Sequence, residues 1–313
     1  MISIVIPIYN EEENLQNLYS RLTAAAPSWN EEYELVLVDD GSADGSLDMM
    51  KAFAKSDAHV RIIKLSRNFG HQPAISAGIQ EAKGNAVVIM DGDLQDPPEE
   101  LYRFLEKWRE GYQVVYAIRT KRKEGFFKRI AYSAFYRMLA AISEIDIPLD
   151  SGDFCVMDRK VVNAIVKEMP EQIRFVRGLR AYAGFKQIGV KYERAERAAG
   201  DVKYTFKKLM ELALDGLFGF SNVPLRLATY FGFVIAIPSF FIGIFFVMAR
   251  LIGFKILGHT PAEIPGTTTL TVGMFFLGGV TLIILGILGE YIGRIYIEVK
   301  RRPFFVIDEI IQE

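Results

Sequence analysis

The first 200 residues alternate short apolar runs with amphipathic stretches of helical spacing. Buried strands are predicted where apolar and β-branched residues run on continuously, at Ser3–Tyr9, Tyr33–Val38, Val60–Leu65, Ala86–Met90 and Gln113–Ala117. Helical spacing fills the intervals, at Glu11–Ala25, Ser46–Lys55, Gln72–Ala82 and Pro98–Glu110. This alternation predicts an α/β domain with a mostly parallel sheet and helices on both faces. In such a sheet a ligand binds beyond the carboxyl ends of the strands.

Two long uncharged stretches follow this domain. Leu227–Ala249 runs for 23 residues without a charge, and Ile264–Gly289 runs for 26. Each exceeds the roughly 20 residues that cross about 30 Å of hydrocarbon, so we predict transmembrane helices at about 227–249 and 266–290. Lysine and arginine are more numerous at the outer ends of this hairpin than in its connector. The positive-inside rule then predicts an integral protein of the inner or plasma membrane with the catalytic domain and both termini in the cytoplasm.

The predicted organisation has four parts: a cytoplasmic domain over 1–203, an amphipathic juxtamembrane helix over 204–226, the two spans within 227–292, and a cytoplasmic tail over 293–313. The apolar side of the juxtamembrane helix would lie in the membrane interface, although packing on the soluble domain explains the same pattern. Glycines in the second span, with the spacing Gly289-x-x-x-Gly293, predict close packing within the hairpin or in a homo-oligomer.

Composition excludes several classes of protein. The 37 Lys and Arg residues balance 38 Asp and Glu residues, so there is no strong field for nucleic acid. The single cysteine, Cys155, excludes an intrachain disulfide framework and fits a reducing compartment. Three scattered histidines with one cysteine do not make a structural zinc site of the usual type.

Acidic residues gather where the predicted strands end. The second strand ends in Asp39-Asp40, and the fourth ends in Asp91-Gly92-Asp93 with Gln95 close behind. Two carboxylates one residue apart repel each other unless a cation neutralises them, and hard oxygen ligands suit Mg²⁺ or Mn²⁺ carrying a substrate diphosphate. The Asp44-Gly45-Ser46 segment is read equally well as a turn that caps a helix.

With these motifs in order, the chain resembles a family 2, GT-A fold (Rossmann-like) glycosyltransferase over essentially its whole length. The resemblance rests on PIYNEEENL, VDDGSADGS, SRNFGHQPAISAGI, MDGDLQDPPE, SGDF and the two-span hairpin. It is strongest to polyisoprenyl-phosphate glycosyltransferases of the bacterial GtrB type, which are related to dolichyl-phosphate mannose synthase. The resemblance implies inverting transfer of a sugar, glucose from UDP-glucose in the first place, to polyprenyl (undecaprenyl) phosphate at the cytoplasmic membrane face. GDP-mannose or another UDP-sugar is the alternative donor.

The resemblance also implies roles on the donor side. Residues that match the nucleotide-sugar site are Pro7, Tyr9, Glu11, Asp40, Asp91, Arg197 and Lys203. Those that match the divalent-metal and diphosphate segment are Asp91, Asp93 and Gln95, with Asp93 also assigned to catalysis. The Mg²⁺ or Mn²⁺ ion would neutralise the charge that develops on the departing nucleoside diphosphate. In the Arg197-x-x-Gly-x-x-Lys203 loop, Val202 stands where the family has serine.

On the acceptor side, the residues that match ligands of the lipid phosphate are Arg119, Arg129 and Ser133. A solvated surface for anionic lipids accounts for the same basic cluster. Asp153 is the candidate catalytic base, but a phosphate monoester with a second pKa near 6 is already largely ionised at pH 7, so positioning is the other role for this residue. His71 is interpreted as a loop residue rather than a catalyst.

Other functions remain as alternatives. A processive polysaccharide synthase is disfavoured because the chain has no Arg-Trp pair and too few spans for a secretion pore. A nucleotidyltransferase usually has a basic glycine-rich loop after the first strand, where this chain is acidic. A catalytically dead, membrane-tethered nucleotide-sugar-binding protein stays open. The expected partners are the nucleotide sugar, polyprenyl phosphate, membrane lipids, a separate flippase and a downstream glycosyltransferase.

Overall fold

A computed structural model describes residues 1–119, 151–169, 171, 176–192, 223–252 and 266–312. The chain divides into two compact units. The first comprises Met1–Phe220 together with Arg301–Glu313, and the second comprises Ser221–Lys300. The predicted juxtamembrane helix lies outside the described residues, except for its last four positions, which begin the first long helix of the second unit.

The first unit is built on a mixed sheet of eight strands in the order β7-β5-β6-β4-β1-β2-β3-β8. The parallel core comprises β1 (Ile2–Ile8), β2 (Tyr33–Asp39), β3 (Val60–Leu65) and β4 (Ala86–Ile89). Next to it, β6 (Ser151–Asp158) runs antiparallel to β4 and to β5 (Val114–Arg119), while β7 (Gln187–Tyr192) is parallel to β5. The α/β class is confirmed, and the parallel pattern holds for the N-terminal half of the sheet.

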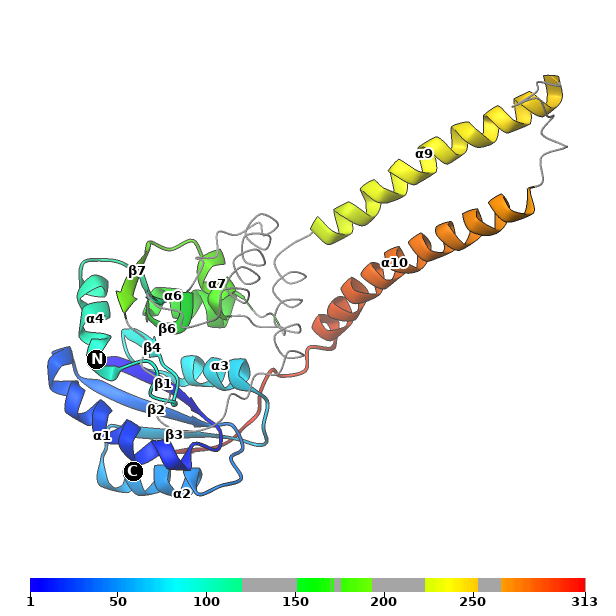
Figure 1. The fold of residues 1–313 in the computed structure, drawn as a ribbon. Helices are drawn as coiled ribbons and strands as arrows, with labels where there is room; N and C mark the ends of the chain where they lie inside the picture. Colours follow the sequence, from blue (N-terminus) through cyan, green and yellow to red (C-terminus); the bar gives the residue numbers. More distant parts are fainter. Residues whose placement is uncertain (120–150, 170, 172–175, 193–222, 253–265, 313) are drawn as a thin grey trace. The chain divides into compact units, whose positions relative to one another are not determined.

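Helices cover both faces of this sheet (Figure 1). One face packs against α1 (Glu12–Trp29), α2 (Ser46–Ser56) and α4 (Leu101–Arg109), which follows the single turn η1 (Pro98–Glu100). The other packs against α3 (His71–Glu81), α6 (Arg159–Asn163), η2 (Ala164–Glu168) and α7 (Val176–Tyr182). Every side chain of β4 is buried, as expected for a strand covered on both faces.

A glycine lets helix α3 pack closely on the sheet. A Cβ atom at Gly78 would fall 2.2 Å from Cγ1 of Val5 on β1 and 2.9 Å from Cγ2 of Val38 on β2. Since any side chain at Gly78 would push the helix outward, the glycine fixes how near the sheet the first residue of α3, His71, can lie.

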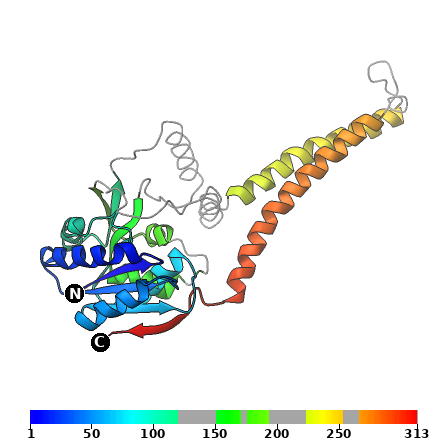
Figure 2. The ribbon, with the colours of Figure 1, turned by 60° about the horizontal axis from the view of Figure 1, so that its bottom comes forward.

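The last strand, β8 (Ile307–Ile311), pairs antiparallel with β3 and forms an edge of the sheet (Figure 2). Lys64 on β3 and Asp308 form an ion pair with an N–O distance of 2.5 Å. The segment assigned from the sequence to a cytoplasmic tail thus includes a strand of the first unit. Local pattern does not predict this strand, because its partner lies some 240 residues earlier in the chain.

The described residues of the second unit form two long helices, α9 (Val223–Ile252) and α10 (Thr267–Lys300), that run antiparallel beside each other. Among the described residues, one stretch, Phe276–Lys300, is long and apolar enough to cross a membrane. At Gly278, Gly279, Gly286, Gly289 and Gly293 of α10, an added Cβ atom would meet no atom of the described residues within 4 Å.

Candidate active site

The carboxyl ends of the central strands bring most of the described candidate residues to one edge of the sheet. Pro7 is the last residue but one of β1 and Tyr9 follows that strand, Asp40 follows β2, and the Asp91–Gln95 segment follows β4. Because β6 runs antiparallel to β4, with Cys155 opposite Ile89, its beginning lies at this same edge. Asp153 therefore joins the other acidic residues, although it comes from the start of its strand.

Hydrogen bonds between two loops fix the end of β1. Asn10 has the left-handed conformation at φ 52°. Its backbone amide donates to the Ser42 hydroxyl oxygen at 3.1 Å, and its side-chain oxygen accepts a bond from the Ala43 amide at 2.8 Å. The Glu11 amide donates to the Ser46 hydroxyl at 3.1 Å, and the Glu12 amide donates to Asp44 at 3.2 Å. These contacts give Asp44 and Ser46 a structural role that holds the segment bearing Tyr9 and Glu11.

Asp40 organises the loop after β3. Its carboxylate accepts hydrogen bonds from the backbone amides of Phe69 at 2.8 Å and Gly70 at 2.9 Å, and the residue is buried. Burial raises the pKa of Asp40, although the two amide bonds act in the opposite direction. The next residue along the chain is His71, so Asp40 sets the position from which the His71 side chain extends.

His71 lies between two acidic residues of the site. Its Nε2 is 3.6 Å from Asp91 Oδ1 and 3.5 Å from Asp153 Oδ2. Burial lowers the pKa of the imidazole, but the hydrogen bond to Asp153 and the charges of both carboxylates outweigh that effect and raise it to about 9. The imidazole is therefore a cation at neutral pH. The sequence suggested an ordinary loop residue, but His71 is the first residue of α3 and contacts two carboxylates of the site.

Asp153 is held by an arginine that sequence reasoning missed. Arg177 on α7 donates from Nε to Oδ1 at 2.7 Å and from Nη2 to Oδ2 at 2.8 Å, a two-pronged pair. Burial alone would raise the pKa of Asp153, but the Arg177 guanidinium, with His71, holds it well below its usual range. The carboxylate is thus ionised and oriented throughout the neutral range. Nothing in the local sequence around Arg177 indicates this partnership.

The segment after β4 carries the candidate metal ligands. Burial, assisted by the neighbouring carboxylates, raises the pKa of Asp91 to about 6, while His71 opposes the shift. Asp93 is buried and accepts a hydrogen bond from the Gln95 amide at 3.1 Å across a turn in which Leu94 has φ 60°. Among the described residues no three His, Cys, Asp or Glu side chains form a metal cluster. The crowded carboxylates nevertheless fit Mg²⁺ or Mn²⁺, which take one or two carboxylates and complete their coordination with substrate phosphates.

Several candidate residues fall outside this description. Arg129, Ser133, Arg197 and Lys203 lie outside the described residues. Arg119 ends β5, and only its backbone is described.

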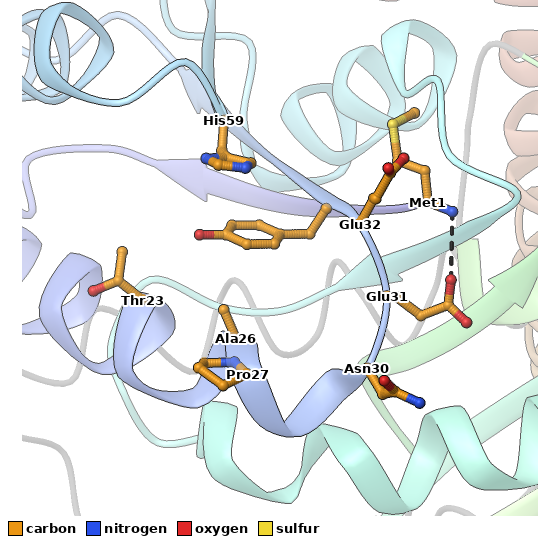
Figure 3. Close-up of a pocket in the computed structure, with 9 residues that line it drawn as sticks. Met1, Thr23, Ala26, Pro27, Asn30, Glu31, Glu32 and His59 are labelled. Atoms are coloured by element: carbon orange, nitrogen blue, oxygen red, sulfur yellow. Dashed lines mark hydrogen bonds and ion pairs between the residues drawn. The ribbon is translucent and has the colours of Figure 1, made fainter.

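A hollow of about 790 Å³ lies at the opposite end of the sheet (Figure 3). Its lining includes Met1, which precedes β1, Tyr33, which begins β2, and His59, which precedes β3. The rings of Tyr33 and His59 stack with centroids 4.5 Å apart. Because these residues lie at the amino ends of their strands, the hollow is separate from the acidic edge.

The shifted His71 predicts a pH dependence of stability. A group whose pKa is raised on folding contributes stability below its unfolded value near 6.5, and this is lost as the pH rises through about 9. Without added metal ion, the melting temperature of the wild-type protein is therefore expected to fall between pH 6.5 and 9, and that of His71→Gln to fall less. His59→Gln, at the other end of the sheet, is the control and keeps the wild-type slope. Equal slopes for wild type and His71→Gln would contradict the assignment.

Sequence comparisons show the family to which the chain belongs. The model of Glycosyl transferase family 2 matches residues 3–166. The chain is 46% identical to the glycosyltransferase YkcC of Bacillus subtilis, over 98% of this chain and 93% of that protein. It is 40% identical to the prophage bactoprenol glucosyl transferase homolog of Escherichia coli, over 99% of both, and 41% identical to the SfII prophage-derived bactoprenol glucosyl transferase of Shigella flexneri, over 98% and 97%. The chain is a member of glycosyl transferase family 2 and is a glycosyltransferase.

Proposed function

We propose that this glycosyltransferase moves a hexose, glucose in the first place, from a UDP-sugar to polyprenyl phosphate at the cytoplasmic face of the membrane, with inversion at the anomeric carbon. The observation that carries the proposal is similarity at 40–41% identity, over almost the whole chain, to proteins named as bactoprenol glucosyl transferases. The clustered carboxylates at the strand ends supply a site of suitable chemistry for the diphosphate of such a donor.

The donor nucleotide is assigned to the end of β1 and the loop after β2. The Tyr9 side chain is 41% exposed beside Pro7, and Glu11 is held by the Ser46 contact. These residues offer an aromatic ring and polar groups to a base and ribose. Asp40, whose carboxylate accepts two loop amides, retains lone pairs for one further hydrogen bond to the base.

Asp91, Asp93 and Gln95 would hold the Mg²⁺ or Mn²⁺ ion together with the donor diphosphate. When bound, the ion neutralises the negative charge that develops on the leaving nucleoside diphosphate. His71 adds a positive charge beside Asp91, which lessens the repulsion among the carboxylates before the donor arrives. Arg197 and Lys203 are assigned to the donor phosphates by family resemblance.

On the acceptor side the attacking group is an oxygen of the lipid phosphate, which is already ionised at neutral pH and needs no strong base. The Asp153 carboxylate, committed to Arg177 and kept ionised, is a weak proton acceptor. We therefore assign Asp153 a positioning role in the site, ahead of general-base catalysis. Arg119, Arg129 and Ser133 are assigned to the acceptor phosphate.

For the membrane unit we propose that α9 and α10 both cross the bilayer. Besides the crossing-length stretch in α10, α9 contains the 23 uncharged residues of Leu227–Ala249. The helices would then enter and leave on the cytoplasmic side, in an inner or plasma membrane. We retain residues 204–226 as an interfacial helix, a homo-oligomer as the assembly, and a flippase and a downstream glycosyltransferase as the proteins that act on the product.

The test is transfer of label into the organic phase. Purified protein is given undecaprenyl phosphate, Mg²⁺ or Mn²⁺, and in turn radiolabelled UDP-glucose, other UDP-hexoses and GDP-mannose. We expect a lipid-soluble product from UDP-glucose that disappears on chelation. Product from GDP-mannose alone would replace the donor assignment. Binding of UDP without transfer from any donor would favour the non-catalytic alternative.

A further inference from the structure

Asp96 has a buried carboxylate and comes directly after the candidate metal segment. The proposed reaction does not use it. Asp96 is fully buried, one residue after Gln95, and accepts a hydrogen bond on Oδ1 from the hydroxyl of Tyr192. Tyr192 is also buried and is the last residue of β7. The two residues are 96 positions apart in the chain, so the contact joins the loop after β4 to a strand on the far side of β6 and β5.

Aromatic side chains surround this contact. The Phe154 ring lies 5.8 Å from that of Tyr192 and 4.6 Å from that of Phe104, and all three residues are buried in the same core. Placing a carboxylate in such surroundings is costly unless hydrogen bonds satisfy it. The Tyr192 hydroxyl supplies one such bond at the place where the loop enters the core.

The geometry of the loop links this buried contact to the metal ligands. Between Asp93 and Asp96 the chain makes a tight turn, with Leu94 in the left-handed conformation and the Gln95 amide bonded to Asp93. Leu94 is itself buried in the core that contains Tyr192. The turn that presents Asp93 and Gln95 is therefore fixed at one end by the bond from the Gln95 amide to the Asp93 carboxylate and at the other by Asp96.

We propose that Asp96 and Tyr192 are positioning residues, whose hydrogen bond holds Asp93 and Gln95 in the arrangement that binds a divalent cation with a nucleoside diphosphate. This inference rests on the proposed function. Tyr192 lies five residues before Arg197 in the sequence, so the same bond joins the metal segment to the strand that leads toward the predicted donor-phosphate residues.

The test compares Tyr192→Phe, which removes one hydroxyl and keeps the ring, with Asp96→Ala and Asp96→Asn. The dissociation constant of Mn²⁺ with UDP is measured by calorimetry, and kcat and KM are measured for the sugar donor. A hydrogen bond to a charged group is worth enough to change an equilibrium about tenfold. Tyr192→Phe is therefore expected to weaken Mn²⁺–UDP binding about tenfold and to raise KM with a smaller change in kcat. Asp96→Asn, which can still accept the bond, should bind better than Asp96→Ala.

Tyr182→Phe is the control, because that tyrosine is on α7 and 63% exposed. Unchanged Mn²⁺–UDP affinity in folded Tyr192→Phe, with or without a lower melting temperature, would overturn the proposal. Wild-type protein that binds no Mn²⁺–UDP would instead refute the proposed function, so the two failures are distinguishable. If Asp96→Ala does not fold, Tyr192→Phe and Asp96→Asn still decide the question.

Discussion

Replacement of Asp93 by alanine is expected to reduce sugar transfer at least about a thousandfold while leaving membrane insertion intact. The physical reason is that stabilisation of the leaving diphosphate by a bound cation is worth several kcal/mol, and removal of one of two carboxylates weakens the hold on that cation. Asp93 is buried at the turn after β4, and its side chain is not part of the membrane unit. The measurement is the initial rate of label transfer to undecaprenyl phosphate at the Mg²⁺ or Mn²⁺ concentration that just saturates the wild-type protein.

Asp48→Ala is the matched control, because Asp48 is an exposed acid on α2. It removes the same charge from the same unit and should keep the wild-type rate. Higher Mn²⁺ concentration should restore part of the activity of an Asp93→Asn variant, which keeps one oxygen ligand. Transfer by Asp93→Ala at near the wild-type rate would remove Asp93 from the metal assignment.

The second large effect is expected from Arg177→Leu. This change leaves the buried Asp153 carboxylate without its two-pronged partner, and removal of one member of a buried pair typically costs about 3–5 kcal/mol. The freed carboxylate would move toward His71, and a displacement of about 1 Å in an active site lowers a rate by roughly a hundredfold. We expect both a lower free energy of unfolding, measured with chemical denaturant, and a transfer rate at least about a hundredfold lower.

A double variant shows how much of the stability lost in Arg177→Leu is due to the unpaired charge of Asp153. Asp153→Asn combined with Arg177→Leu removes both charges and should recover part of the stability lost in Arg177→Leu alone. If Asp153 positions rather than accepts a proton, the Asp153→Asn single variant, which keeps the size of the side chain, should transfer sugar within about tenfold of the wild-type rate at pH 7, where the acceptor phosphate is already largely ionised. A rate at least about a hundredfold lower in folded Asp153→Asn, the contribution typical of a general base, would contradict the positioning role.

The part of the fold that could be predicted is the part that local pattern specifies. A short, continuous apolar run such as that of β1 is typical of a strand buried on both faces. Once the strands are predicted, the location of the acidic residues at the ends of β2 and β4 can be read from the sequence. The shared edge of Asp40 and Asp91 was predictable because parallel strands place their carboxyl ends together.

The contacts that complete the site depend on residues far apart in sequence. Arg177 is 24 positions from Asp153, and Tyr192 is 96 from Asp96. Neither pairing produces a periodic pattern in the sequence. The tertiary fold brings α7 and β7 to the site, because β6 lies antiparallel between β4 and β5 in the sheet. His71 was underestimated for a related reason, since its two carboxylate neighbours come from β4 and β6 rather than from its own loop.

The position of β8 changes how the membrane unit should be regarded. Because residues 307–311 return to the sheet after α10, the helical hairpin is topologically an insertion within the catalytic domain rather than an appendage at its end. Six residues, 301–306, connect the end of α10 at Lys300 to the start of β8 at Ile307. A soluble enzyme cut after residue 220 would expose the unpaired edge of β3, whereas one that rejoins residue 220 to 301 through a short linker would keep the sheet whole.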